Sequence, residues 1–202
     1  MLTIWGRLNS HNVKKVAWLA EEIGLPYVRH DVGGAFGMDA AYLAKNPNAL
    51  IPTIEDEGLI LWESNVILRY LAARHAPDLW PADPAARAIG DRWMDWQFGY
   101  ADVQRGLFLN RVRRAPEARD PAEAERATIA CGEQMAILDA ALAERPWLSG
   151  EAFGIGDIPM GVYTHTYFTL ADTRPPLPHV TDWYGRLKAR PGYAATVMIP
   201  LT

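Results

Sequence analysis

Polar residues cluster at two positions where the sequence predicts that a helix begins. Asn9, Ser10 and Asn12 precede an apolar stripe of helical spacing, and Glu63 and Ser64 precede another. The first backbone amides of a helix are unpaired, and the helix dipole favours negative charge there. Each cluster therefore either caps its helix or binds an anionic group of a ligand.

The first cluster has the chemistry to hold a thiolate. Lowering the pKa of a thiol from about 8.5 by two units requires about 2.7 kcal/mol. One charge-assisted hydrogen bond from a hydroxyl, together with the helix end, can supply that energy. The alternative is that Ser10 or Asn12 only caps the helix, which is the commoner role of such residues. Asn9 is also close, and the residues alone do not separate these donors.

The second cluster suits an amino-acid group that carries both charges. Free amides and the Ser64 hydroxyl at a helix start can bind a carboxylate, while the Glu63 carboxylate can receive an ammonium group. A purely structural alternative is a helix cap next to an acid that favours the helix dipole.

Short strands and helices must position these clusters. Residues 2–5 predict a buried strand, residues 13–23 predict a helix that ends at Gly24, and residues 25–32 predict a second strand. This order is a βαβ unit with a right-handed crossover. Residues 51–61, with a turn at Asp56–Glu57–Gly58, predict a β-hairpin that leads into the helix at Ser64.

The remainder of the chain is predicted to be helical. Residues 76–85 contain three prolines and two aspartates, a composition typical of a linker. Apolar residues of helical spacing follow it and predict a bundle. The stripes fall near residues 89–100, 127–142, 158–170 and 180–187.

Composition excludes several classes of function. The 202 residues carry a net charge of −4, so there is no electrostatic case for binding nucleic acid or an anionic membrane. The start of the chain lacks secretory-signal features, and no apolar run is long enough to span a membrane. A single cysteine, Cys131, precludes an intramolecular disulfide and a thiolate-rich zinc site, and the five histidines show no metal-ligand spacing. We expect a cytoplasmic protein with no metal.

Three segments together carry a resemblance to the glutathione transferase superfamily. They are GRLNSHNVKKVAWLAEEIGLPY at 6–27, NPNALIPTIEDEGLILWESNVILRYLA at 46–72 and WLSGEAFGIGDIPMG at 147–161. The resemblance covers essentially the whole chain and is to bacterial branches with serine or asparagine at the thiol-activating position. The third segment departs from the family pattern, because Gly154 replaces the usual Ser or Thr capping residue although Asp157 is kept.

The resemblance implies a two-domain architecture. Residues 1–76 would form an α/β thioredoxin-like N-terminal domain that binds glutathione. Residues 77–85 would be a linker, and residues 86–202 would form an all-α C-terminal helical bundle domain. Two such chains would form a homodimer.

The resemblance also assigns the residues that bind glutathione. Ser10 would activate the thiol with support from Asn12. Pro52 would follow a cis peptide bond, and the backbone of Ile51 would pair with the cysteinyl part of glutathione in the manner of a strand. Glu63 and Ser64 would bind the γ-glutamyl end. The glycine-rich stretch 33–38 lacks phosphate-loop spacing and would border the peptide, with Phe36 touching it.

A third group of residues concerns the second substrate. Tyr100, Gln104 and Phe108 recur every four residues, so they share one helix face, for which core packing is the usual explanation. The resemblance implies that this face lines a second-substrate cleft together with aromatic residues such as Tyr163 and Tyr167.

The sequence thus predicts a glutathione transferase that activates glutathione for attack on a small electrophile, as in detoxification. Glutathione would be a co-substrate, with no further cofactor. Two alternatives stay open: glutathione-dependent reduction of disulfides or peroxides, and a non-catalytic binding module with the same fold.

Overall fold

The computed structural model describes all 202 residues. Its N-terminal part begins with the predicted βαβ unit, made of β1 (Leu2–Trp5), α1 (His11–Glu22) and β2 (Tyr27–His30). Strands β1 and β2 are parallel, with Leu2 opposite Tyr27. The predicted unit is confirmed, although β2 is shorter than the apolar pattern suggests.

The predicted hairpin is also present. Strands β3 (Thr53–Asp56) and β4 (Leu59–Trp62) are antiparallel and complete a sheet of order β2-β1-β3-β4. Glu57 and Gly58 form its two-residue turn with φ values of +48° and +86°. Both lie in the left-handed region that a tight hairpin turn requires, and glycine adopts it without strain.

Two short elements between β2 and β3 were not predicted. They are the 3-10 turn η1 (Gly34–Phe36) and the helix α2 (Ala40–Lys45). Six residues make fewer than two helical turns, so α2 is too short to show a helical period in the sequence. Its start is fixed by Asp39, whose carboxylate accepts a hydrogen bond from the Tyr42 amide at 2.8 Å.

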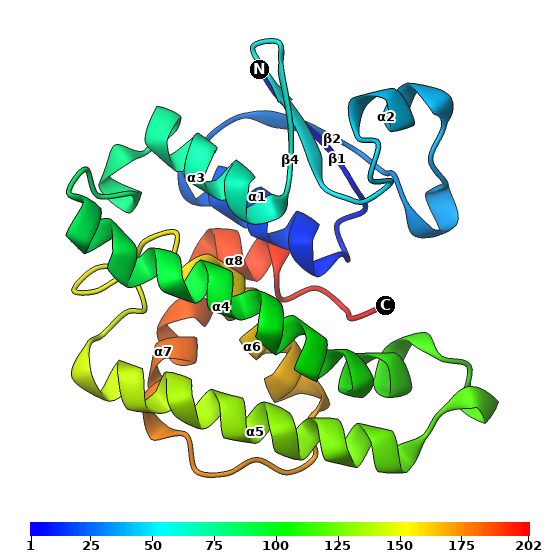
Figure 1. Cartoon of the computed structure of the whole chain (residues 1–202), viewed down its shortest axis with the longest axis vertical. Helices are drawn as coiled ribbons and strands as arrows, with labels where there is room; N and C mark the ends of the chain where they lie inside the picture. The colour runs from blue at the N-terminus through cyan, green and yellow to red at the C-terminus, as the bar shows by residue number, and fades with distance from the viewer.

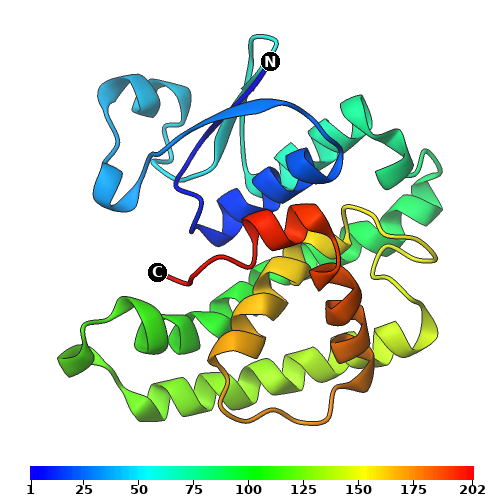
Figure 2. The same ribbon diagram turned by 180° about the vertical axis from the view of Figure 1, so that it is seen from behind.

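Helix α1 lies at the boundary between the two domains (Figure 1, Figure 2). It packs against α3 (Ser64–His75) of its own domain and against α6 (Asp157–Leu170) and α8 (Pro191–Thr196) of the helical domain. Every residue from 13 to 20 on α1 is buried, and two of these are lysines. The residues that the sequence places at the start of this helix therefore lie where the domains meet.

The first long helix after the predicted linker begins at Pro84, two residues before residue 86, where the helical domain was predicted to start. After the 3-10 turn η2 (Pro77–Leu79), the long helix α4 (Pro84–Phe108) starts inside the predicted linker. Pro84 occupies the first turn, where its missing N–H costs nothing, and Asp83 caps the helix through the Ala86 amide at 2.9 Å. Helices α5 (Pro121–Glu144), α6, α7 (Pro178–Lys188) and the unpredicted six-residue α8 complete the bundle.

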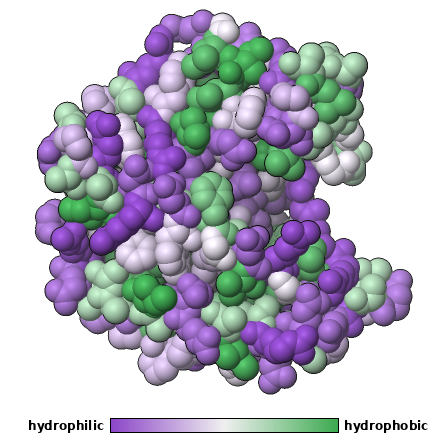
Figure 3. Space-filling view, viewed as in Figure 1, coloured by the Kyte–Doolittle hydropathy of each residue, from purple (hydrophilic) through white to green (hydrophobic).

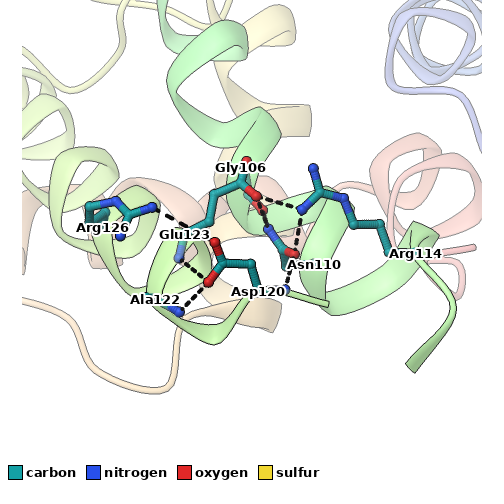
Figure 4. Close-up of polar contacts among 7 residues, drawn as sticks. All are labelled: Gly106, Asn110, Arg114, Asp120, Ala122, Glu123 and Arg126. Atoms are coloured by element: carbon teal, nitrogen blue, oxygen red, sulfur yellow. Dashed lines mark hydrogen bonds and ion pairs between the residues drawn. The ribbon is translucent and has the colours of Figure 1, made fainter. Parts of the chain in front are cut away.

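Helix α4 ends in a π-helical turn, η3 (Leu109–Arg113), that a polar network joins to the start of α5 (Figure 4). Asn110 donates to the Gly106 carbonyl at 2.8 Å and to Glu123 at 3.0 Å. Its own side-chain oxygen accepts from Arg114 at 2.8 Å and from the Asp120 amide at 2.7 Å. Because both the nitrogen and the oxygen of the Asn110 side-chain amide are hydrogen-bonded, they hold the π-helical turn η3 in one position.

Asp157 holds the start of α6, where Gly154 stands in place of a Ser or Thr capping residue. Its buried carboxylate accepts hydrogen bonds from the Leu148 amide at 2.8 Å, the Gly154 amide at 3.1 Å and the Trp183 indole at 2.9 Å. One carboxylate therefore ties α6 to the preceding loop and to α7. A Cβ atom at Gly154 would lie 2.9 Å from the Ser149 side chain and 3.1 Å from the Leu79 carbonyl oxygen, so these neighbours would have to move to accommodate Ser or Thr.

Candidate functional site

The side chain of Ser10 is free at the start of α1. Ser10 is the N-cap residue, with φ −78° and ψ 129°, and its carbonyl accepts from the Lys14 amide at 2.9 Å. Its hydroxyl makes no capping hydrogen bond, and the first turn contains no acidic residue. The hydroxyl and the first amides of the helix are therefore available to an external anion.

The two neighbouring asparagines differ. The side-chain oxygen of Asn9 accepts from Arg7 at 2.5 Å, and its amide group donates to the Thr202 hydroxyl. Both the oxygen and the nitrogen of the Asn9 side chain are thus hydrogen-bonded within the protein. Asn12 is half-buried one residue inside the helix. Of the three donors in this cluster, Ser10 and Asn12 are the ones left for a ligand.

Ile51 lies beside the loop that leads to Ser10. The Ile51–Pro52 peptide bond is cis, as expected. A Cβ atom at Gly6 would lie 3.3 Å from the Cβ of Ile51 and only 2.5 Å from Val13, so glycine is required for this approach. A Cβ atom at Gly33 would lie 3.2 Å from Ile51 as well. The β1–α1 loop, the glycine-rich stretch and the residue before the cis-proline therefore converge.

The start of α3 has an unusual backbone conformation. Glu63 is the N-cap with a φ of +72°, a region that non-glycine residues rarely adopt, and its side chain is exposed. Such conformations persist where the surrounding structure imposes them, often at ligand sites. Ser64, the first residue of α3, is 4% exposed.

A buried lysine connects α1 to Ser64, and sequence reasoning missed it. The ammonium group of Lys15 donates to Ser64 Oγ at 3.3 Å, to Asn65 Oδ1 at 3.2 Å and to Gln97 Oε1 on α4. Burial lowers the pKa of Lys15 to about 7, although the charge of Glu63 acts in the opposite direction. The available signal was a charged pair, Lys14 and Lys15, within an otherwise apolar stripe.

His11, the residue after Ser10, lines a cavity of about 160 Å³ between the domains. Its ring stacks on Tyr163 with centroids 4.8 Å apart, and its Nε2 lies 2.7 Å from the Thr166 hydroxyl oxygen. Figure 3 shows the molecule hollowed between its α2 region and the far end of α4, and the start of α1 lies at this hollow in Figure 1. Sequence patterns did not indicate a role for His11, because its cavity forms only when α1, α4 and α6 meet.

The electrostatic environment of this cavity is positive. Burial is the main cause that lowers the pKa of His11 to about 3. Four nearby cations add to the effect, and they are Lys14, Lys15, Arg113 and Arg7. Charges that oppose a protonated imidazole favour an anion in the same place.

The three residues predicted for the second-substrate cleft are divided between cavity and core. Gln104 and Phe108 line the cavity with His11 and Tyr163. Tyr100 does not line it and is 1% exposed. The Gln104 amide donates to Tyr100 Oη at 3.2 Å and to the Tyr163 carbonyl at 2.9 Å, so it also joins α4 to α6.

Phe36 and Tyr167 lie outside this cavity. Phe36 is 61% exposed and borders a separate pocket of about 290 Å³ with Trp5 and Lys45, beside α2. Tyr167 is fully buried in the core. The chain holds no group of three or more His, Cys, Asp or Glu side chains arranged to bind a metal, and none of its helices is long and apolar enough to cross a membrane.

Comparison with known proteins identifies the family of the chain. Residues 9–74 match the family described as "Glutathione S-transferase, N-terminal domain". An Escherichia coli K12 protein named glutathione S-transferase GstB is 43% identical, with both chains covered completely. The E. coli disulfide-bond oxidoreductase YfcG is 29% identical over 89% of this chain and 87% of its own.

A solved structure is similar over the whole length. It is the theta class glutathione S-transferase from the citrus canker pathogen Xanthomonas axonopodis pv. citri with glutathione bound. The two chains are 51% identical with a TM-score of 0.96, and the match covers 100% of this chain and 99% of that one. Full-length matches to both proteins, together with the N-terminal family match, establish that the chain belongs to the glutathione transferase family.

Proposed function

We propose that this protein activates the thiol of glutathione at Ser10 and transfers the peptide to a small electrophile held in the cavity lined by His11. Glutathione is a substrate in this reaction rather than a bound cofactor. The observation that carries the proposal is the unused Ser10 hydroxyl at a helix start that carries no acid and faces a positive environment.

The protein lowers the free energy of the thiolate by two means. The Ser10 hydroxyl donates a charge-assisted hydrogen bond to sulfur, which contributes about 1.5–3 kcal/mol. The start of α1 and the cations around His11 favour negative charge at the same place. Asn12 is the supporting donor in this proposal.

The chemical step needs little more than orientation once the thiolate exists. The thiol proton leaves to solvent, the sulfur forms a bond to the electrophilic carbon, and the leaving group departs with the electron pair of the bond that breaks. Ile51 aligns the peptide through its backbone beside the cis-proline. Fixing two reactants side by side removes much of the entropic barrier to their reaction.

Glu63 and Ser64 bind the γ-glutamyl end of glutathione in this account. The exposed Glu63 carboxylate pairs with the ammonium group, and the Ser64 hydroxyl with the first amides of α3 binds the carboxylate. Gln104 and Phe108 contact the electrophile from α4. Tyr100, on the same helix, packs in the core. Phe36, at the end of the 3-10 turn η1, contacts the peptide from the glycine-rich loop in this proposal.

We also propose that two chains form a dimer. Five apolar side chains on β4, α3 and α4 are exposed by 37–47%, and they are Leu59, Ile60, Trp62, Val66 and Phe98. Exposed apolar residues on neighbouring elements are typical of a protein interface. Light scattering should give twice the mass of the 22.5 kDa chain. A cytoplasmic location completes the proposal, because the reducing cytosol suits both glutathione and a protein with one buried cysteine.

The experiment that tests the function combines binding with turnover. Calorimetry should detect glutathione binding, and the enzyme should form the thioether of chlorodinitrobenzene faster than glutathione alone does at the same pH. Ser10→Ala should lose most of this acceleration while still binding the peptide. Binding without acceleration in the unmodified protein would instead favour the non-catalytic module.

Reduction of disulfides is the second candidate, favoured by the similarity to YfcG. Cys131 is buried and its pKa is raised to about 11, so a protein thiolate is not available at neutral pH. Reduction would therefore consume two glutathione molecules and release oxidised glutathione. A coupled assay with glutathione reductase distinguishes the reactions, because conjugation releases no oxidised glutathione.

A further inference from the structure

Lys15 is a buried cation without a carboxylate against it. Its side chain is 0% exposed, and its three hydrogen bonds end on the neutral oxygen atoms of Ser64, Asn65 and Gln97. A lysine ammonium has three N–H donors, so all of them are used. A buried charge is costly unless an opposite charge compensates it, and the protein places none in contact.

The hydrogen bond from Lys15 also fixes the direction of the Ser64 hydroxyl. An ammonium group can only donate, so the Ser64 oxygen must accept from it. The hydroxyl hydrogen of Ser64 then points elsewhere and can donate to a ligand. Ser64 lies at the start of α3 and is 4% exposed, so it contacts Lys15 on its buried side and keeps a small surface that a ligand can reach.

The contacts of Lys15 are rigid on the protein side. Asn65 accepts from Lys15 through its oxygen and donates from its nitrogen to the Met94 carbonyl at 2.6 Å, so it joins α3 to α4. Gln97, on α4, accepts a hydrogen bond from the same ammonium group through its side-chain oxygen. The ammonium group is thereby held between both domains, directly behind Ser64.

We propose that Lys15 is a positioning residue for glutathione: it orients the Ser64 hydroxyl and supplies the positive charge that the γ-glutamyl carboxylate neutralises on binding. This inference rests on the proposed binding of glutathione at Glu63 and Ser64. The ligand thus supplies the counter-charge that the protein does not place in contact with Lys15.

The groups around Lys15 make its charge sensitive to binding. Glu63 is the acidic group whose charge raises the pKa of Lys15. The ring centres of Phe98 on α4 and Tyr163 on α6 lie 5.9 and 5.6 Å from the lysine nitrogen. His11 lies one turn earlier on α1. Its pKa of about 7 leaves it largely neutral at about pH 8 in the free protein. A carboxylate bound at Ser64 favours the charged form, so binding takes up a proton.

The first test compares two peptides by calorimetry at about pH 6.5. Glutathione carries the γ-glutamyl carboxylate, whereas γ-aminobutyryl-cysteinyl-glycine lacks it and keeps the amine. Lys15→Met should weaken glutathione binding about tenfold and leave the affinity for the analogue within about twofold. Equal weakening for both peptides, or no weakening of glutathione binding, would overturn the proposal.

Lys14→Met is the matched control. Lys14 is the neighbouring buried lysine on α1, but its ammonium group donates to the Val197 carbonyl at 2.9 Å, away from Ser64. The selective loss of glutathione binding should be absent from this variant. The same selective loss in Lys14→Met would mean that general positive charge, and not the contact with Ser64, explains the effect.

The second test uses the unmodified protein and so does not depend on how the variants fold. The probe is S-methylated glutaryl-cysteinyl-glycine, which keeps the carboxylate but has no amine or thiol to titrate. Calorimetry in buffers of different ionisation enthalpy should detect proton uptake at about pH 8 and almost none at about pH 5.5. No uptake at either pH would contradict the proposal, whereas failure of glutathione itself to bind would contradict the proposed function instead.

Discussion

The proposed glutathione side and the proposed electrophile side of the site are built differently. The first uses backbone at the cis-proline and polar groups at two helix starts, each fixed by its local conformation. The second uses rings and side chains from α1, α4 and α6 around a small cavity. Fixed polar groups select one ligand, whereas packed side chains can adjust to several. The difference implies that mutations on the two sides should change different kinetic constants.

Among these variants, Glu63→Ala should produce the largest difference between its effects on the two substrates. Removing the counter-charge of the glutathione ammonium group should weaken glutathione binding ten- to hundredfold, because a hydrogen bond between charged groups contributes about 1.5–3 kcal/mol. The KM for the electrophile should stay nearly constant. Steady-state kinetics with each substrate varied in turn measures both. A parallel rise in both KM values would show that the two sides of the site do not bind their substrates independently.

His11, next to Ser10 but inside the electrophile cavity, should make folding stability depend on pH. Its pKa is about 3 in the folded protein and about 6.5 when unfolded, so the unfolded chain binds the extra proton. This contribution to stability is fully present above about pH 6.5 and is lost as pH falls towards 3.

Urea unfolding measures this effect. Between about pH 6.5 and 4.5 the protein should lose about 2 kcal/mol more than His11→Gln does. His179→Gln, which removes an exposed histidine on α7, is the control and should follow the unmodified protein. A pH profile of His11→Gln identical to that of the unmodified protein would show that the imidazole is protonated equally in both states.

Phe108→Ala should have a smaller effect than Glu63→Ala, and it should affect the electrophile instead of glutathione. Loss of an aromatic contact costs about 1 kcal/mol, so the KM for an aromatic electrophile should rise about fivefold while glutathione affinity is unchanged. Phe36→Ala is the matched control, because Phe36 borders the other pocket. If Phe36→Ala raised the electrophile KM as much as Phe108→Ala did, the assignment of the cavity would be wrong.

Cys131→Ala should have the smallest effect on activity. The thiol is buried on α5 with a raised pKa, so neither half of the site uses it as a nucleophile. Conjugation should stay within about twofold, and thermal unfolding should shift by the equivalent of about 1 kcal/mol for the lost packing. A large loss of conjugation in the folded variant would point to a protein thiol in the reaction.

The same contrast governs what the sequence could predict. Ser10, Pro52, Glu63 and Ser64 belong to short motifs whose order along the chain indicates both the fold and the residues. The positions of β1, α1 and the hairpin follow from local apolar patterns, and the structure agrees with them. Helices α2 and α8 were missed because six residues do not establish a period.

The electrophile side was less predictable because its residues come together only through packing. Helical spacing grouped Tyr100 with Phe108, yet a helix face is wide enough for one residue to lie in the core and another at the cavity. His11 and Lys15 gave little signal in the sequence. Their environments depend on α4 and α6, which approach α1 only in the folded protein.

Stabilisation of the thiolate of bound glutathione by Ser10 is tested most directly by the ultraviolet absorbance of that thiolate as a function of pH. Ser10→Ala should raise the pH midpoint by about one to two units, since one charge-assisted hydrogen bond is lost, while Ser10→Thr keeps a hydroxyl and should move it much less. Folding stability should change little, because this hydroxyl does not cap α1. An unchanged midpoint in both Ser10→Ala and Asn12→Ala would contradict the account and assign the stabilisation to the backbone amides of the helix.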